Sequence, residues 1–116
     1  MHAVIFEVEP RSKKRKLEYL DLARNLREEL EKIDGFLSVE RFQSLVNRNK
    51  LVSLSFWRDE QAIINWRNHI MHKKAQTEGY ATIFSNYRIR VAEITRDYDM
   101  ENRKQAPQKI PTVTVA

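Results

Sequence analysis

The residues best suited to chemistry gather between Trp66 and Gln76. This stretch holds one of the two tryptophans and two of the three histidines of the chain. His69 and His72 are three residues apart, so in a helix they share a face. An imidazole can accept and return a proton near neutral pH, and an indole can stack on an aromatic ring. We therefore take His72, His69 and Trp66 as candidate catalytic residues.

Four further residues are candidates for substrate binding: Asn68, Phe56, Tyr87 and Arg88. Phe56 would extend an apolar wall beside Trp66 and exclude water from an aromatic ring. Asn68 or Arg88 would donate hydrogen bonds to a developing oxyanion. The alternative is that both histidines cap or bridge a bent helix, while the tryptophan belongs to the core.

A metal site is a weaker interpretation of the two histidines. Histidines at i and i+3 bind iron or zinc when an acid completes the set. Glu78 lies six residues after His72 and Asp59 lies ten before His69, so neither stands at a companion spacing. The chain has no cysteine, which excludes a thiolate metal site and a cysteine nucleophile. We expect neither a metal nor another cofactor.

Composition limits the class of protein. The 116 residues suffice for one core, and 41% hydrophobic with 32% charged residues is a globular balance. The net charge of +5 permits anionic partners, but the cations are spread except for Arg11 to Lys16, which we interpret as a solvated helix start. No stretch approaches the roughly 20 apolar residues of a membrane span. We expect a cytoplasmic protein that binds neither nucleic acid nor membrane.

Hydrophobic periodicity predicts six elements. In order, they are a strand over 2–9, a helix over 13–33, strands over 36–46 and 50–57, a helix that begins after Asp59 and reaches about residue 78, and a strand over 84–98. The predicted buried stripe of the first helix is Leu17, Leu20, Ala23, Leu26, Leu30 and Ile33. Asn68 could cap a separate helical piece, so a bend is expected near Trp66–Asn68. A change of apolar phase predicts a β-bulge near Ala92–Glu93.

The order β-α-β-β-α-β is that of an α+β, ferredoxin-like domain: an antiparallel four-stranded sheet with two helices on one face. Residues 1–98 form this domain, and residues 99–116 form a polar C-terminal tail. Val113 and Val115 could add an edge strand in an oligomer, although a loose tail is favoured. The uncovered sheet face holds too many apolar residues to stay in water, which predicts a homodimer packed sheet on sheet.

Several segments carry a family resemblance. They are Gly35–Phe42, Leu54–Glu60, Trp66–His69 with His72, Ala75 and Gln76, and Phe84 with Tyr87–Val91. With these segments the chain resembles the antibiotic biosynthesis monooxygenase domain family, whose members are dimeric α+β barrels. The resemblance implies a ligand cavity between sheet and helices, with Trp66 in its wall.

Some members of that family oxidise polycyclic phenols or quinols with O2 and without metal or flavin. In them an asparagine, the tryptophan, a tyrosine and an arginine line the site. The asparagine position falls near Ala62 and the tyrosine position on His72, while Arg88 stands for the arginine. Other members degrade haem with a histidine ten residues beyond the tryptophan, where this chain has Gln76, so haem degradation is not expected.

The sequence thus predicts a cofactor-independent monooxygenase that oxidises a small aromatic, phenolic or quinol-type substrate with O2. The alternative is a non-catalytic dimer of the same fold, which binds a small molecule or serves a structural role. A pocket beside Trp66, His69 and His72 would favour catalysis or binding, whereas a packed core there would favour the structural role.

Overall fold

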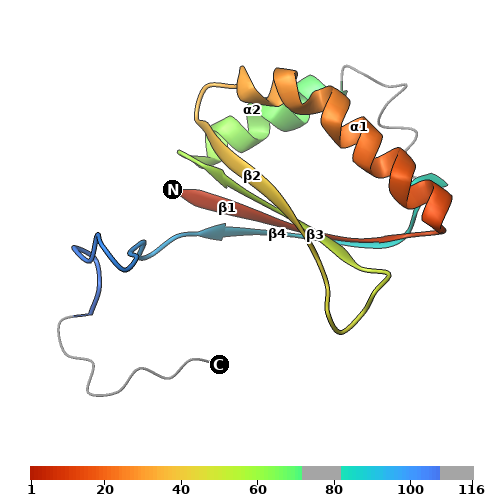
Figure 1. Ribbon diagram of the computed structural model, residues 1–116. Helices are drawn as coiled ribbons and strands as arrows, with labels where there is room; N and C mark the ends of the chain where they lie inside the picture. Colours follow the sequence, from red (N-terminus) through yellow and green to blue (C-terminus); the bar gives the residue numbers. More distant parts are fainter. Residues whose placement is uncertain (72–81, 108–116) are drawn as a thin grey trace.

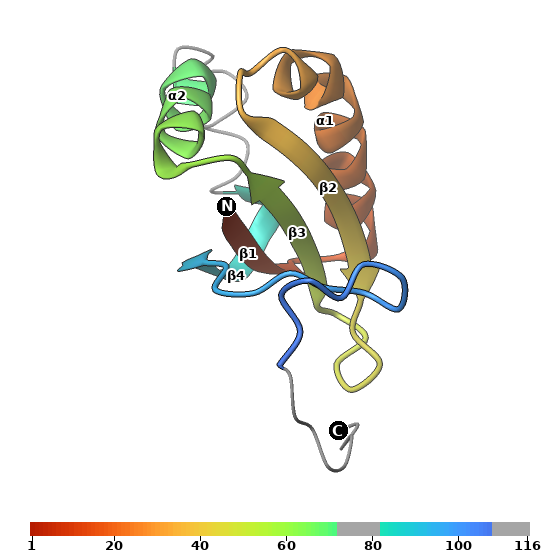
Figure 2. The same cartoon turned by 90° about the vertical axis from the view of Figure 1, so that its left-hand side faces the viewer.

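The computed structural model describes residues 1–71 and 82–107. The elements are β1 His2–Pro10, α1 Lys13–Glu31, β2 Phe36–Gln43, β3 Leu51–Trp57, α2 Glu60–Met71 and β4 Phe84–Glu93. The strands form one antiparallel sheet in the order β2-β3-β1-β4. Both helices lie on the same side of this sheet (Figures 1 and 2). The predicted ferredoxin-like α+β fold is confirmed.

The helices start where side chains cap them. The Ser12 hydroxyl accepts a hydrogen bond from the Arg15 backbone N–H at 3.1 Å, and Asp59 Oδ1 accepts one from the Ala62 backbone N–H at 2.9 Å. Each bond satisfies a donor that the first turn of a helix cannot pair internally. Each predicted helix therefore begins directly after a residue that caps it, Ser12 for α1 and Asp59 for α2.

The core between helices and sheet consists of two clusters. One is formed by Val8, Tyr19, Leu51, Ile83 and Phe84, and the other by Leu30, Trp57 and Ala62. The predicted stripe of α1 is wrong at its start, because Leu17 is 57% exposed while Tyr19 is buried. The Tyr19 ring packs edge-on against Phe84 and its hydroxyl accepts a hydrogen bond from Arg41 Nε at 3.3 Å. That polar partner makes the burial of a tyrosine tolerable.

Three predicted details of the elements are wrong. Helix α2 runs without interruption from Glu60 to Met71, so Asn68 lies inside it and caps no second piece. Strand β4 ends at Glu93 because its partner β1 begins at His2. The irregularity of this strand pair lies at the opposite end from Ala92–Glu93, between Glu9 and Pro10. Proline has no N–H for the ladder, so the register changes there.

The chain beyond β4 turns rather than extending the sheet. Asp99 Oδ1 accepts hydrogen bonds from the backbone N–H groups of Glu101 and Asn102, and the Asp97 N–H donates to Gln105 Oε1 at 2.7 Å. Val113 and Val115, the predicted edge strand, lie outside the described residues. None of the helices in the described part of the chain has the length and apolar character that crossing a membrane requires.

Candidate functional site

Strand register assigns each side chain of the sheet to one of two faces. On the helix side, Val4 pairs with Val91, Phe6 with Ile89 and Val8 with Tyr87. On the other side, which we call the open face, Ala3 pairs with Ala92, Ile5 with Arg90 and Glu7 with Arg88. In β4, Tyr87, Ile89 and Val91 therefore lie on the helix side, and Arg88 and Arg90 lie on the open face. The helix side offers an apolar surface and the open face a charged edge.

Trp66 and His69 lie together on α2. Their ring centroids are 5.7 Å apart and their planes meet at 24°, so the two rings are stacked. Trp66 is half-buried and packs against the cluster of Leu30, Trp57 and Ala62. This packing fixes the position of the indole, and the imidazole is held by stacking on the indole.

A carboxylate from the other helix faces His69. The Nε2 atom of His69 lies 3.9 Å from Glu29 Oε1 of α1, within ion-pair range if the imidazole is protonated. The same nitrogen is buried, and none of the described residues forms a hydrogen bond with it. Glu29 was not predicted from the sequence, although it follows Leu26 of the buried stripe by three residues and so flanks that stripe.

Strand β4 presents a row of apolar side chains on the helix side. Tyr87, Ile89 and Val91 are 60%, 54% and 49% exposed, although they share a face with the buried core. The row lies on the same side of the sheet as Trp66, because Val4, which pairs with Val91, packs against the same cluster as Trp66. We call Trp66 and His69 of α2, with Tyr87, Ile89 and Val91 of β4, the α2–β4 surface. It presents apolar side chains and an ionisable ring on one side of the sheet.

The predicted site residues are not all brought together. Phe56 pairs with Ala3 on the open face and Arg88 lies on the same face, so neither stands beside Trp66. A wall of Phe56 and Trp66 is therefore wrong, because the sheet separates the two rings. Asn68 is exposed on α2 and lies two positions from Trp66, which places it on a different side of the helix. His72 lies outside the described residues.

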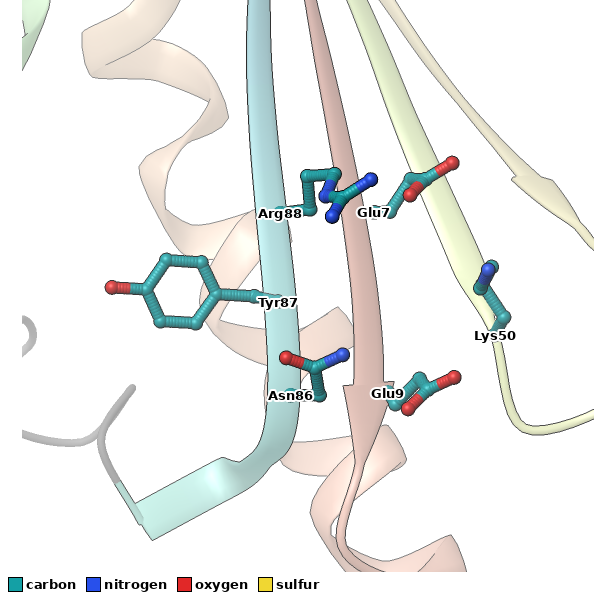
Figure 3. A pocket seen from close by; sticks show the side chains of 6 residues that line it. All are labelled: Glu7, Glu9, Lys50, Asn86, Tyr87 and Arg88. Atoms are coloured by element: carbon teal, nitrogen blue, oxygen red, sulfur yellow. The ribbon is translucent and has the colours of Figure 1, made fainter.

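The open face has a polar groove of about 230 Å³. It is lined by Glu7, Glu9, Lys50, Asn86, Tyr87 and Arg88. Figure 3 shows the Tyr87 ring pointing away from the side on which the other five side chains lie. Both carboxylates are occupied: Arg90 Nη1 lies 3.3 Å from Glu7 Oε2, and Asn47 Nδ2 donates to Glu9 Oε1 at 3.0 Å. Within residues 1–71 and 82–107, no group of three or more potential metal ligands occurs.

A family model and curated relatives match the sequence. The antibiotic biosynthesis monooxygenase family model matches residues 1–78. Over 95 residues the chain is 41% identical to the jasmonate monooxygenase ABM of Pyricularia oryzae, an alignment that covers 82% of this chain and 44% of the relative. The chain spans about half the length of the curated relatives that it matches.

Solved structures share the fold. A mutant of SnoaB, a cofactor-independent oxygenase from Streptomyces nogalater, has a TM-score of 0.66 at 9% identity, over 83% of this chain and 94% of that chain. The monooxygenase ActVA-Orf6 of Streptomyces coelicolor, solved with nanaomycin D, has a TM-score of 0.64 at 15% identity, over 78% and 84%. The family model covers more than half of the sequence, and the fold agrees with it. This chain belongs to the antibiotic biosynthesis monooxygenase family.

Proposed function

We propose that this chain is a monooxygenase domain that oxidises a small aromatic, phenolic or quinol-type substrate with O2 at the α2–β4 surface. The observation that carries the proposal is the stacked pair of Trp66 and His69, which lies on the same side of the sheet as the half-exposed row of Tyr87, Ile89 and Val91. An aromatic substrate laid on this row would lose water from its faces and gain ring contacts. Membership in a monooxygenase family supports the same assignment.

The reaction needs no external reductant. A base removes the phenolic proton, and the phenolate gives one electron to O2. The substrate radical and superoxide then combine into a hydroperoxide at the ring carbon opposite the oxygen. Loss of water from the hydroperoxide leaves a carbonyl there. One oxygen atom enters the product, the other leaves as water, and the substrate supplies both hydrogens of that water.

We assign the base to His69 or His72 and the stacking platform to Trp66. The carboxylate of Glu29 lies 3.9 Å from His69 Nε2 and would stabilise the imidazolium that forms when His69 takes the proton. Cofactor independence is part of the proposal, supported by the description of the Streptomyces nogalater relative as a cofactor-independent oxygenase. Asn68 and Arg88 lie outside the α2–β4 surface. In this mechanism they therefore do not contact the reacting atoms.

A homodimer is the second part of the proposal. The open face carries Ile5, Leu54 and Phe56, which are half-buried in the single chain, and Phe42, which is 45% exposed. A second copy packed on this face would remove these side chains from water.

A single domain over residues 1–98 with a separate tail, and a cytoplasmic location, stay predictions.

One observation favours the non-catalytic alternative. The contact of His69 with Glu29 joins α2 to α1, so the histidine could serve the packing of the two helices alone. In that case the chain would bind a small molecule without oxidising it. Binding and turnover must therefore be measured in the same experiment.

Oxygen uptake tests the proposal. The protein is incubated with catechol, naphthol, anthrone and jasmonate, the last because the Pyricularia oryzae relative is named for it. We expect uptake matched by product for at least one aromatic compound, and a loss of about 10²- to 10⁴-fold in kcat when His69→Ala or His72→Ala removes the base. His2→Ala, at the third histidine, is the control and should keep the wild-type rate. Tight binding without uptake for every compound would establish the non-catalytic alternative.

A further inference from the structure

The loop between β2 and β3 presents two aliphatic side chains to water. Leu45 is 97% exposed and Val46 is 99% exposed. Burying side chains of this kind is favourable, because their apolar surface leaves water. Single exposed apolar residues are common on protein surfaces, whereas these two are adjacent and almost wholly exposed at the end of a hairpin. We call Leu45 and Val46 the hairpin tip.

Hydrogen bonds hold the loop on both sides of the hairpin tip. The Ser44 backbone N–H donates to the Lys50 carbonyl at 3.0 Å, and the Asn47 backbone N–H donates to the Ser44 hydroxyl at 3.0 Å. The Gln43 side-chain amide donates to the carbonyls of Arg48 and Lys50 at 2.8 and 2.9 Å. Moving the tip onto the sheet would break these bonds. The exposure of the tip is therefore a property of an ordered loop.

Cations from two segments gather at this end of the sheet. Lys16 Nζ donates to Gln43 Oε1 at 2.9 Å, which connects the start of α1 to the base of the loop. Figures 1 and 2 show the start of α1 and the β2–β3 loop at the same end of the sheet. The run Arg11–Lys16 holds five cations and no acid, and the loop adds Arg48 and Lys50 without an acid. The hairpin tip therefore lies at a basic end of the molecule.

Two acidic side chains near this end are already bound. Asn47 Nδ2 donates to Glu9 Oε1 at 3.0 Å, and Arg15 Nη1 lies 2.8 Å from Glu18 Oε2. Several of the cations are exposed, namely Arg11, Lys13, Lys14 and Arg48. These cations are therefore accessible to an anionic partner that meets the hairpin tip.

An anionic lipid surface is the partner that fits an apolar tip beside cations. Aliphatic side chains enter the boundary between lipid head groups and acyl chains, while lysine and arginine contact anionic head groups. A nucleic acid would attract the cations, but proteins bind its bases by aromatic stacking and hydrogen bonds rather than with two exposed aliphatic side chains. The two basic segments come from separate elements, so they suit an extended anionic surface better than a single bound anion.

We propose that the protein adsorbs to anionic lipid bilayers through the hairpin tip, with Arg48, Lys50 and the Arg11–Lys16 run on the head groups. The expectation that the chain binds no membrane follows from the lack of a membrane-spanning stretch, and adsorption does not require one. The inference depends neither on the proposed oxidation nor on the proposed homodimer.

Co-sedimentation with vesicles tests the proposal. Vesicles of phosphatidylcholine alone are compared with vesicles that contain about one third phosphatidylserine, and we expect binding to the anionic vesicles only. Raising the salt from about 0.1 M to about 1 M shortens the Debye length from about 10 Å to about 3 Å and should weaken binding at least about tenfold.

Two double variants separate the apolar part from the charged part. We expect Leu45→Ser with Val46→Ser, and Arg48→Glu with Lys50→Glu, each to lower the partition coefficient at least about tenfold. The matched controls are Met100→Ser, at a methionine that is 93% exposed, and Arg96→Glu, at an exposed arginine. Both controls follow the end of β4 that pairs with the start of β1, opposite the hairpin end, and should bind like wild type. Circular dichroism verifies folding.

A dye reports directly on the position of the tip. The chain has no cysteine, so Leu45→Cys takes a single polarity-sensitive dye. We expect its emission to shift to the blue on anionic vesicles, and the same dye on Met100→Cys to show no shift.

The other outcomes would overturn the proposal. Wild-type protein that does not sediment with anionic vesicles would exclude adsorption. A tip variant that binds vesicles like wild type would show that charge alone holds the protein there. If that variant also changed the sedimentation velocity of the free protein, the tip would belong to a contact with a protein partner instead.

Discussion

At the scale of single residues, the sequence predicts contacts between side chains of the same helix or strand. It does not predict contacts between side chains of two different elements. His69 and Trp66 stack as their spacing on one helix suggests. Glu29 reaches His69 from another helix, and no spacing along the chain predicts that contact. Arg88 and Tyr87 are adjacent in sequence yet lie on opposite faces of the sheet, so only Tyr87 can contact a ligand on the helix side.

Tyr87 should therefore matter for binding. Tyr87→Ala removes a ring that is 60% exposed on the α2–β4 surface, and we expect the dissociation constant of an aromatic ligand to rise about tenfold, since ring contacts contribute on the order of 1 kcal/mol. Isothermal titration with a naphthol measures the change. Tyr98→Ala, an exposed tyrosine beyond β4, is the control. Equal affinities for the two variants would place the ligand elsewhere.

At the scale of elements, a cluster of charges joins two connections at one end of the sheet. The Arg58 guanidinium, after β3, donates to both carboxylate oxygens of Asp34 at 3.1 Å and to Asp59 at 2.9 Å. The Arg58 backbone N–H donates to the carbonyl of Gly35 at 2.7 Å. Gly35 has φ +92°, and a Cβ there would lie 2.8 Å from that of Ala62, so only glycine fits this connection.

The cluster predicts a pH-dependent stability. Hydrogen bonds from Arg58 hold the pKa of Asp34 and of Asp59 below their usual range, and for Asp59 the Ala62 N–H adds to the effect. Carboxylates with a lowered pKa in the folded state stabilise it above their unfolded pKa, about 3.9, and lose that contribution as pH falls through the lowered value. Arg58→Ala should lower the melting temperature at pH 7, and the difference from wild type should shrink below about pH 4.

Thermal melting between pH 7 and pH 2.5 measures this difference. Arg24→Ala, which removes an exposed ion pair with Asp21 within α1, is the control for loss of a surface arginine. A difference between wild type and the Arg58 variant that stays constant over this range would show that the two aspartates do not depend on Arg58.

Local patterns predict the elements better than their ends. Hydrophobic periodicity suffices to predict all six elements, because it depends only on neighbours in sequence. The predicted bend at Asn68 is wrong, because a residue that could cap a new helix can also continue the existing one. The predicted bulge at Ala92–Glu93 is wrong, because the end of a strand depends on its partner strand. Phe56 was placed beside Trp66 because the alternation of apolar residues shows which residues of a strand share a face. It does not show which of the two faces is turned toward the helices.

At the scale of the whole molecule, the two faces of the sheet differ in chemical character. The helix side combines a stacked indole and imidazole with an apolar row, and the open face combines an apolar centre with charged edges. The proposed function places oxidation on the helix side and association on the open face, and the candidate residues divide between these two faces. The sequence predicts both a site and a dimer. Only the register of the strands shows how the candidate residues divide between the two faces of the sheet.

The source of the oxygen atom in the product tests the central claim most directly. The substrate that supports oxygen uptake is turned over under ¹⁸O2 in unlabelled water, and the product is analysed at once by mass spectrometry, with ¹⁶O2 in labelled water as the reverse control. A monooxygenase of the proposed kind places one ¹⁸O atom in each product molecule and the other in water. Product without label, or product with both labelled atoms, would contradict the assignment.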